Sequence, residues 1–244
     1  VDRALVELLR EGGEQIDAIY ERNDVAIRTL EGLEQGKGFY QMEGLRTDLS
    51  GHVTITENRI KYDVDYIEGQ KTGFFLDQKY NRQAAAKLAR GRRVLDCFTH
   101  TGAFALNAAA AGAEYVTAVD VSAFALELAA ENGKRNGLTN LDYKCADVFD
   151  LLTEMAKEKK CDYDYIILDP PAFTKSRATA KNAYHGYKEI NMKAMRLLPR
   201  GGYLATCSCS HFMTYELFTK TIGQAAHSVH KRLRQVEFRT QSPD

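Results

Sequence analysis

The sequence predicts an α/β fold with a mostly parallel sheet, preceded by a small N-terminal α+β domain. Beyond residue 67, short apolar segments alternate with helical ones, a pattern typical of a parallel sheet with helices on both faces. The 244 residues, 44% of them hydrophobic, suffice for a substantial core. We therefore expect a small domain over residues 1–66 and a larger one over residues 67–244.

The N-terminal domain is expected to contain one helix and several short strands. Helical periodicity runs from about Arg3 to Tyr20. Four alternating segments follow, at residues 26–30, 38–42, 51–57 and 59–66. The last two flank Asn58 and indicate a hairpin. No chemical motif occurs here, so we interpret this domain as a packing or substrate-orienting unit.

In the larger domain, apolar strands are predicted at residues 93–97, 115–120, 141–145, 165–169, 203–207 and 232–238. Helices are predicted at residues 103–111, 123–136, 149–157, 187–198 and 215–227. Ligands of such sheets bind beyond the carboxyl ends of the strands. Four acids and a thiol fall at or just past such ends: Asp96, Asp120, Asp147, Asp169 and Cys209. This edge is therefore the predicted site.

The net charge is zero overall, which argues against a general nucleic-acid binder. Its distribution is uneven, because residues 1–66 hold 8 Lys and Arg against 14 Asp and Glu, and the remainder holds 25 against 19. Residues 170–188 carry cations interleaved with aromatic residues and no acid, as expected of a surface that meets phosphates and unstacked bases. A solvated loop and helix start is the alternative. The predicted substrate contacts are Phe173, Lys175, Tyr187 and Lys188.

No membrane span, metal site or disulfide framework is expected. No run of 18 apolar residues exists, and no Cys/His spacing resembles a zinc site. The five cysteines are odd in number and mostly lie in apolar strands, which favours reduced thiols and a cytoplasmic protein. The chain begins at Val1 with an amphipathic segment that does not resemble a signal peptide, and without Met, so we expect a fragment.

The turn after the first predicted strand of the sheet, residues 96–102, indicates the cofactor. A dinucleotide fold needs Gly-x-Gly-x-x-Gly here, but this turn has one glycine and bulky residues in its middle. A turn that an acid opens suits S-adenosylmethionine, which carries cationic and amino groups. Asp120 is placed to bind both ribose hydroxyls, whereas helix capping is its alternative and Ser122 already supplies a cap.

Other residues around this turn complete the predicted cofactor site. Asp147 can take the adenine amino group, although helix capping competes for it. Phe75 and Gln78 can close over the cofactor, and ordinary domain packing is their alternative. The full predicted set is Phe75, Gln78, Asp96, Phe98, Thr99, Thr101, Gly102, Asp120, Val121, Asp147, Asp169 and Pro170.

Two strand ends suggest covalent catalysis on a pyrimidine. A thiolate that adds to carbon 6 makes carbon 5 nucleophilic, and a group near ring nitrogen 3 stabilises the adduct. Asp169, followed by Pro170 and Pro171, suits the second role. Cys209 suits the first, because it lies past the strand end, whereas Cys207 is expected to be a packing residue. The alternative for any lone cysteine is an inert apolar side chain.

Six segments carry a family resemblance: residues 71–78, 95–104, 119–122, 169–173, 186–191 and 208–210. Together they resemble the class I methyltransferases that form 5-methylcytosine in bacterial large-subunit ribosomal RNA, over roughly residues 15–244. The resemblance implies a Rossmann-like class I methyltransferase fold, S-adenosylmethionine as cofactor and ribosomal RNA as partner. It also implies roles for Cys209 as nucleophile, Asp169 as the Asp-Pro-Pro acid, Asp120 as ribose ligand and Asp147 as adenine contact.

The chain departs from that family pattern in three ways. The family usually begins with a small RNA-binding PUA domain and closes its sheet with a seventh, antiparallel strand, and neither is found between Val1 and Asp244, so both gaps lead us to expect a fragment. Ala172 and Phe173 occupy the place where many such enzymes carry a second cysteine. Some other group must then assist elimination.

Other functions compete with this reading. The nearest is a guanine N-methyltransferase of ribosomal RNA, which needs no thiol. Methylation of a small molecule or protein, and a non-catalytic RNA-binding module on the same fold, are further alternatives. A nicotinamide dehydrogenase is disfavoured, because the turn at 96–102 lacks its glycines.

Overall fold

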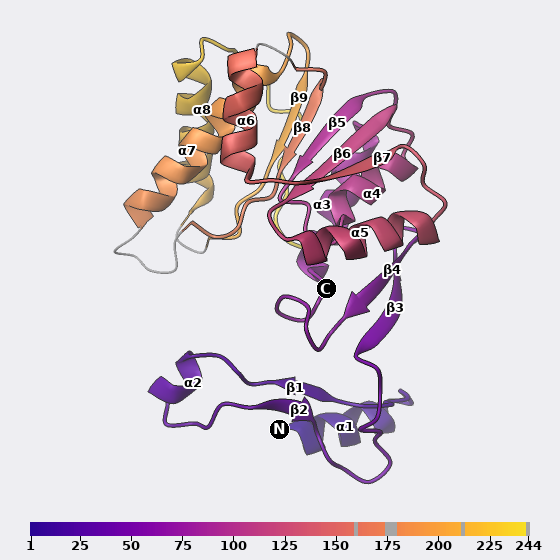
Figure 1. The fold of residues 1–244 in the computed structure, drawn as a ribbon. Helices are drawn as coiled ribbons and strands as arrows, with labels where there is room; N and C mark the ends of the chain where they lie inside the picture. Colours follow the sequence, from indigo (N-terminus) through magenta and orange to yellow (C-terminus); the bar gives the residue numbers. More distant parts are fainter. Residues whose placement is uncertain (159–160, 174–179, 211–212, 243–244) are drawn as a thin grey trace. The chain divides into compact units, whose positions relative to one another are not determined.

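The computed structural model describes residues 1–158, 161–173, 180–210 and 213–242 (Figure 1). The chain forms two compact units. The first unit comprises residues 1–55 and 62–75, and the second comprises residues 56–61 and 76–244. The predicted site falls almost wholly in the second unit.

The first unit contains α1 (Asp2–Glu11), β1 (Tyr20–Arg22), α2 (Ile27–Leu30) and β2 (Lys37–Phe39), with β1 and β2 antiparallel. The helix predicted to reach Tyr20 ends at Glu11, because Gly12 and Gly13 follow and Gly13 adopts φ 84°. The alternating segment at 26–30 forms the single helical turn α2 instead of a strand.

The hairpin predicted around Asn58 is present, and the chain passes from the first unit to the second and back within it. Its strands are β3 (His52–Glu57) and β4 (Ile60–Asp65), which form a two-stranded sheet. Asn58 and Arg59 at the turn both have positive φ, 52° and 68°, the conformation that tight two-residue hairpin turns require. The turn residues belong to the second unit.

The second unit is built on a five-stranded parallel sheet with the order β7-β6-β5-β8-β9. Its strands are β5 (Arg93–Cys97), β6 (Tyr115–Asp120), β7 (Leu141–Cys145), β8 (Tyr165–Leu168) and β9 (Tyr203–Thr206). The register places Val94 beside Val116 on one side and Tyr165 on the other. The parallel sheet is confirmed, and strand order brings the carboxyl ends of β5, β6 and β8 to one edge.

Helices cover both faces of this sheet (Figure 1). They are α3 (Lys79–Lys87), α4 (Ala103–Ala110), α5 (Ala123–Arg135), α6 (Val148–Glu158), α7 (Ala180–Leu197) and α8 (Tyr215–Ser228), with a 3₁₀ turn, η1 (Leu76–Gln78), before α3. Successive strand residues face opposite ways. Val94 therefore packs in one core cluster with residues of α3 and α4, and Leu95 packs in another with residues of α6 and α7.

Three features differ from the sequence prediction. Residues 232–238 form no strand and are exposed, because they pair with none of the strands that the structure describes. The helix predicted to begin at Tyr187 begins at Ala180. The helix α3 was not predicted. In the described part of the chain, no helix has the length and apolar character needed to cross a membrane.

Candidate functional site

The turn that follows β5 has an unusual backbone. Phe98 and His100 adopt positive φ, 65° and 52°, and Gly102 adopts 84°. A Cβ on Gly102 would lie 2.5 Å from Cδ1 of Leu106, so no side chain fits there. Positive φ at bulky residues is costly and is found mostly where the surrounding structure enforces it. The turn therefore presents bare backbone at Gly102 where the helix α4 begins.

Asp96 lies at the carboxyl end of β5 and is completely buried, at 0% exposure. Its Oδ2 accepts a hydrogen bond from the Thr99 hydroxyl at 2.5 Å. Among the described residues no well-formed hydrogen bond reaches Oδ1, although the nearby Ala105 amide opposes the rise in pKa. Burial raises the pKa of Asp96 to about 7, the Thr99 hydrogen bond opposes the rise, and the charge of Asp169 adds to it.

Asp120, at the end of β6, is held by backbone amides. Its Oδ2 accepts from the His100 N–H and its Oδ1 from the Ser122 N–H, both at 2.9 Å. Ser122 caps α5 by accepting from the Ala125 N–H at 3.2 Å, so Asp120 is not needed as that cap. The next residue, Val121, is 72% exposed. Each oxygen of Asp120 retains lone-pair capacity for a hydroxyl of a ligand.

Asp147 is exposed and accepts the Asp150 N–H at 3.0 Å, which caps the first turn of α6. This is the alternative that sequence reasoning left open for Asp147. The cap uses Oδ1, and the other oxygen of this exposed carboxylate can accept a hydrogen bond from a ligand.

Asp169 lies directly after β8 and is partly buried. Its Oδ1 accepts a hydrogen bond from the side-chain amide of Gln78 at 3.1 Å. Burial raises the pKa of Asp169 to about 6, the charge of Asp77 adds to the rise, and the Arg82 charge and the Gln78 hydrogen bond oppose it. Pro170, the next residue, is buried. A carboxyl group with this pKa can hold or release a proton near neutral pH.

The two cysteines after β9 differ in accessibility. Cys209 is exposed, and its thiol donates a hydrogen bond to the Pro170 carbonyl oxygen at 3.8 Å. Cys207 is half-buried and packs against the apolar cluster on the α3 and α4 face, and burial raises the pKa of its thiol. Cys209 is therefore the more accessible of the two cysteines, and it contacts Pro170, the residue next to Asp169.

The predicted substrate residues are placed less favourably. Phe173 packs edge-on against Tyr187, with ring centroids 4.7 Å apart, and Tyr187 is 0% exposed with its hydroxyl 2.9 Å from Oγ of Ser210. The buried ring of Tyr187 therefore packs against the segment 170–173 through Phe173, and is not exposed to a substrate. Lys188 is half-buried on α7. Lys175 lies outside the described residues.

Phe75 and Gln78, predicted together, are separated by the division into units. Phe75 ends the first unit, where the Lys71 ammonium lies 5.0 Å from its ring centroid. Gln78 belongs to the second unit and contacts Asp169. The remaining predicted residues of the turn, Thr99 and Thr101, are buried within it.

Sequence reasoning missed the supports of Gln78. Asn81 donates a hydrogen bond to Oε1 of Gln78 at 2.7 Å. On the same helix, Arg82 is 2% exposed and donates two hydrogen bonds of 2.7 Å to the carboxylate of Glu57. The alanine-rich stretch around Arg82 gives no signal in the sequence for either contact.

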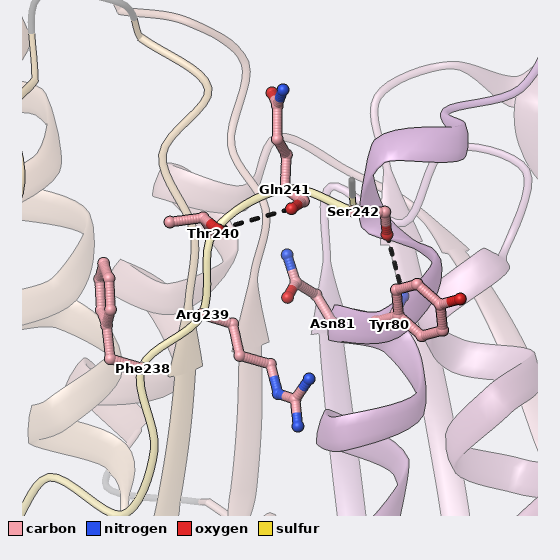
Figure 2. Close-up of a pocket in the computed structure, with 7 residues that line it drawn as sticks. All are labelled: Tyr80, Asn81, Phe238, Arg239, Thr240, Gln241 and Ser242. Atoms are coloured by element: carbon pink, nitrogen blue, oxygen red, sulfur yellow. Dashed lines mark hydrogen bonds between the residues drawn. The ribbon is translucent and has the colours of Figure 1, made fainter. Parts of the chain in front are cut away.

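An open pocket of about 340 Å³ borders this helix (Figure 2). It is lined by Tyr80 and Asn81 of α3 and by residues 238–242. Ser242 connects the two sides, because its Oγ accepts from the Tyr80 N–H at 3.3 Å and its N–H donates to the Asp77 carbonyl at 2.7 Å. The pocket therefore reaches Asn81, which contacts Gln78, but its lining does not include Asp169 or Cys209.

These observations test whether the strand-end residues suit S-adenosylmethionine. Among the described residues no well-formed hydrogen bond reaches Oδ1 of Asp96, and this buried carboxyl group marks a place where a cationic group would be stabilised. Asp120 retains acceptors for hydroxyls, and Gly102 leaves backbone bare. The residues fit such a cofactor. No cluster of potential metal ligands occurs among the described residues.

Comparison with known proteins gives three kinds of likeness. A family model described as S-adenosylmethionine-dependent methyltransferase matches residues 40–244. Proteins named "Ribosomal RNA large subunit methyltransferase I" from Photobacterium profundum and Shewanella denitrificans are each 45% identical, over 229 and 230 residues. Those matches cover 93% of this chain but 56% of each relative, so the chain spans little more than half their length.

Solved structures share the fold. A putative S-adenosylmethionine-dependent methyltransferase from Streptococcus mutans is 28% identical, with a TM-score of 0.67 over 78% of this chain and 49% of that one. SMU.776, a putative methyltransferase complexed with SAH, is also 28% identical, with a TM-score of 0.66 over 77% of this chain and 49% of that one. Trm5b from Pyrococcus abyssi, at 20% identity and TM-score 0.65, covers 93% of this chain and 59% of that one, and shows likeness of fold alone.

Proposed function

This chain belongs to the family of S-adenosylmethionine-dependent methyltransferases, and we propose that it methylates carbon 5 of a cytosine in large-subunit ribosomal RNA. The names of the two relatives at 45% identity support the RNA substrate. The choice of carbon 5 is supported by an accessible thiol beside an acid, since methylation of a ring nitrogen needs no thiol.

The cofactor supplies an electrophilic methyl group, which carbon 5 of the ring accepts. We assign its ribose to Asp120, whose two oxygens are already oriented by the His100 and Ser122 amides. We assign its cationic end to the neighbourhood of Asp96 and the turn up to Gly102. Asp147 is the weakest member of the proposed set, because it caps α6.

The chain's own residues carry the covalent steps. The Cys209 thiolate forms a bond to carbon 6 of the cytosine, and electron density moves through the ring toward nitrogen 3 and carbon 5. Asp169 in its protonated form donates a hydrogen bond, or its proton, to nitrogen 3. After methyl transfer, carbon 5 loses its proton to a base, the carbon 6–sulfur bond breaks, and Cys209 leaves as thiolate.

A pKa of about 6 suits Asp169 for this role. Near neutral pH a fraction of the carboxyl groups is protonated, and the carboxylate left after the donation can take the proton back from nitrogen 3 when the adduct collapses. The target base must also leave its stack to reach the strand ends, at a cost of roughly a few kcal/mol. We further expect the protein to act in the cytoplasm, where cysteine thiols such as those of Cys207 and Cys209 stay reduced.

The observation that carries the proposal is the exposed Cys209 thiol, hydrogen-bonded to the carbonyl of the residue that follows Asp169. The test uses an in vitro transcript of large-subunit ribosomal RNA containing 5-fluorocytidine, with S-adenosylmethionine. Fluorine at carbon 5 cannot leave as a proton does, so the adduct is trapped. We expect wild type to form a covalent complex that survives denaturing gel electrophoresis.

Cys209→Ala is expected to form no complex, and Cys207→Ala, the matched control two residues earlier, is expected to form it as wild type does. A complex that persists in Cys209→Ala would overturn the assignment of the nucleophile. Mass spectrometry of the methylated nucleoside from unmodified transcript decides the class: 5-methylcytidine supports the proposal, and N-methylguanosine favours the guanine N-methyltransferase instead.

A further inference from the structure

We propose that Asn81 is a positioning residue for Asp169, acting through the side-chain amide of Gln78. The proposal deepens the function proposed above and rests on it for its catalytic meaning. The contacts themselves do not depend on that function, because they lie within the second unit and join residues of α3, η1 and the loop after β8.

The three side chains form one directed chain of hydrogen bonds. Nδ2 of Asn81 donates to Oε1 of Gln78 at 2.7 Å, and Nε2 of Gln78 donates to Oδ1 of Asp169 at 3.1 Å. A glutamine amide has one end that only accepts and another that only donates. Because Asn81 occupies the accepting end, the donating end is turned toward the carboxylate.

The backbone that carries Gln78 and Asn81 is fixed on two sides. Arg82, the next residue on α3, is held by the two hydrogen bonds to buried Glu57. At the start of the helix, the cap residue Gln78 makes no side-chain cap hydrogen bond, and Ser242 instead accepts from the Tyr80 N–H (Figure 2). The backbone at Gln78 therefore has little freedom, and its side-chain amide can change direction only by rotation about the side-chain bonds.

Which end of that amide faces Asp169 matters for proton transfer. A donor beside a carboxylate favours its charged form, so the Gln78 amide holds the pKa of Asp169 lower than burial alone would. The reversed amide would present an oxygen, which only the protonated acid can satisfy. Other groups that influence the charge of Asp169 are Asp77, Arg82, Asp96, Tyr187 and Cys207.

The test reverses the polarity of Asn81 without changing its shape. In Asn81→Asp an acceptor replaces the donor, so the Gln78 amide is expected to turn its N–H₂ toward position 81 and its oxygen toward Asp169. The measurement is a pH titration of aspartate side-chain carbons by ¹³C NMR on the full chain without RNA. The Asp169 signal is assigned from its loss in Asp169→Asn.

We expect the titration midpoint of Asp169 to rise by about 1 pH unit in Asn81→Asp, and by roughly half as much in Asn81→Leu, which removes the donor without adding charge. Gln83→Asp, an exposed site on the same helix, controls for added charge and is expected to shift the midpoint by no more than about 0.2 pH unit. An unchanged midpoint in both Asn81 variants, or an equal shift in Gln83→Asp, would overturn the proposal.

This experiment can fail independently of the function proposed above. The Asp169 midpoint could move as expected in a protein whose Cys209 forms no adduct. That result would support the positioning role of Asn81 and contradict the proposed methylation of cytosine. When both hold, the pH profile of kcat on the ribosomal RNA transcript is expected to move upward with the Asp169 midpoint in Asn81→Asp. The KM for cofactor is expected to stay within about twofold, because Asp120 is untouched.

Discussion

The carboxyl ends of the strands carry two groups of residues that are built in different ways. At β5 and β6, Asp96 and Asp120 are held by Thr99, His100 and Ser122, which lie at most 20 residues away in the sequence. At β8 and β9, the partner of Asp169 lies 91 residues away and that of Cys209 lies 39 residues away. We call these the local half and the distant half of the site.

The two halves also differ in the kind of group that does the holding. Both oxygens of Asp120 accept from backbone amides, whose direction is fixed by the fold. Asp169 accepts from a side-chain amide that can turn over. The local half therefore suits the constant recognition of the cofactor that we propose for Asp120, whereas the distant half suits the proton transfer that we propose for Asp169.

The sharpest test of this division is Asp169→Asn. The amide keeps the shape of the acid but cannot transfer a proton, so kcat is expected to fall by roughly 10²- to 10⁴-fold. Cofactor affinity, measured by calorimetry, is expected to change by less than about threefold because Asp120 is intact. The comparison breaks if kcat and affinity fall together.

A matched control lies at the opposite end of the same strand. Asp162 is exposed and precedes the amino end of β8, so Asp162→Asn changes the same kind of group far from the carboxyl ends of the strands. It is expected to keep kcat within about twofold of wild type, because the contact that Asp162 makes is an exposed ion pair with Arg93 at 4.0 Å, and such surface pairs contribute little.

The sequence predicts the local half well, because its contacts are encoded by neighbours in the chain. The strands at 93–97, 115–120 and 141–145 were predicted at their observed bounds, since apolar strands followed by helices give a strong pattern. The capping role of Ser122 and the position of Asp120 follow from the same short stretch. The hairpin around Asn58 was also predicted for a local reason, its turn residues.

The distant half could not be predicted in the same way. Nothing near Gln78 in the sequence points to Asp169, and nothing near Arg82 points to Glu57, because these pairs exist only once the units have folded. The predicted strand at 232–238 fails for a related reason: a β pattern specifies a strand only if a partner edge is present. Lys175, predicted to bind substrate, falls outside the described residues.

The next test concerns stability in the local half. Because the folded pKa of Asp96 is raised from an ordinary 3.8 to about 7, the folded state binds more protons than the unfolded state between these values. The free energy of unfolding therefore falls as pH rises from about 4 to about 7. Over the part of this window above pH 5, the contribution of Asp96 is about 2–3 kcal/mol.

Asp96→Asn removes this titration, so the decline in stability between pH 5 and pH 8 is expected to be smaller than in wild type by about 2–3 kcal/mol. The measurement is urea unfolding of the cofactor-free protein at both pH values. Using the difference between the two pH values cancels any constant effect of placing an amide near Thr99 and Ala105. A decline as steep in the variant as in wild type would show that Asp96 is charged in the folded protein at pH 5.

The smallest expected effect separates two acids within the predicted cofactor site. Asp120→Ala removes an acceptor that backbone amides already orient, and is expected to weaken binding of S-adenosylmethionine by roughly 10- to 100-fold, as loss of charge-assisted hydrogen bonds does. Asp147→Ala is the matched comparison, since Asp147 is exposed and occupied in capping α6. We expect it to lower the free energy of unfolding by about 1 kcal/mol and cofactor affinity by less than about threefold. Equal losses of affinity in calorimetry would mean that Asp147 binds the cofactor as well as capping α6, and that the local half extends to the end of β7.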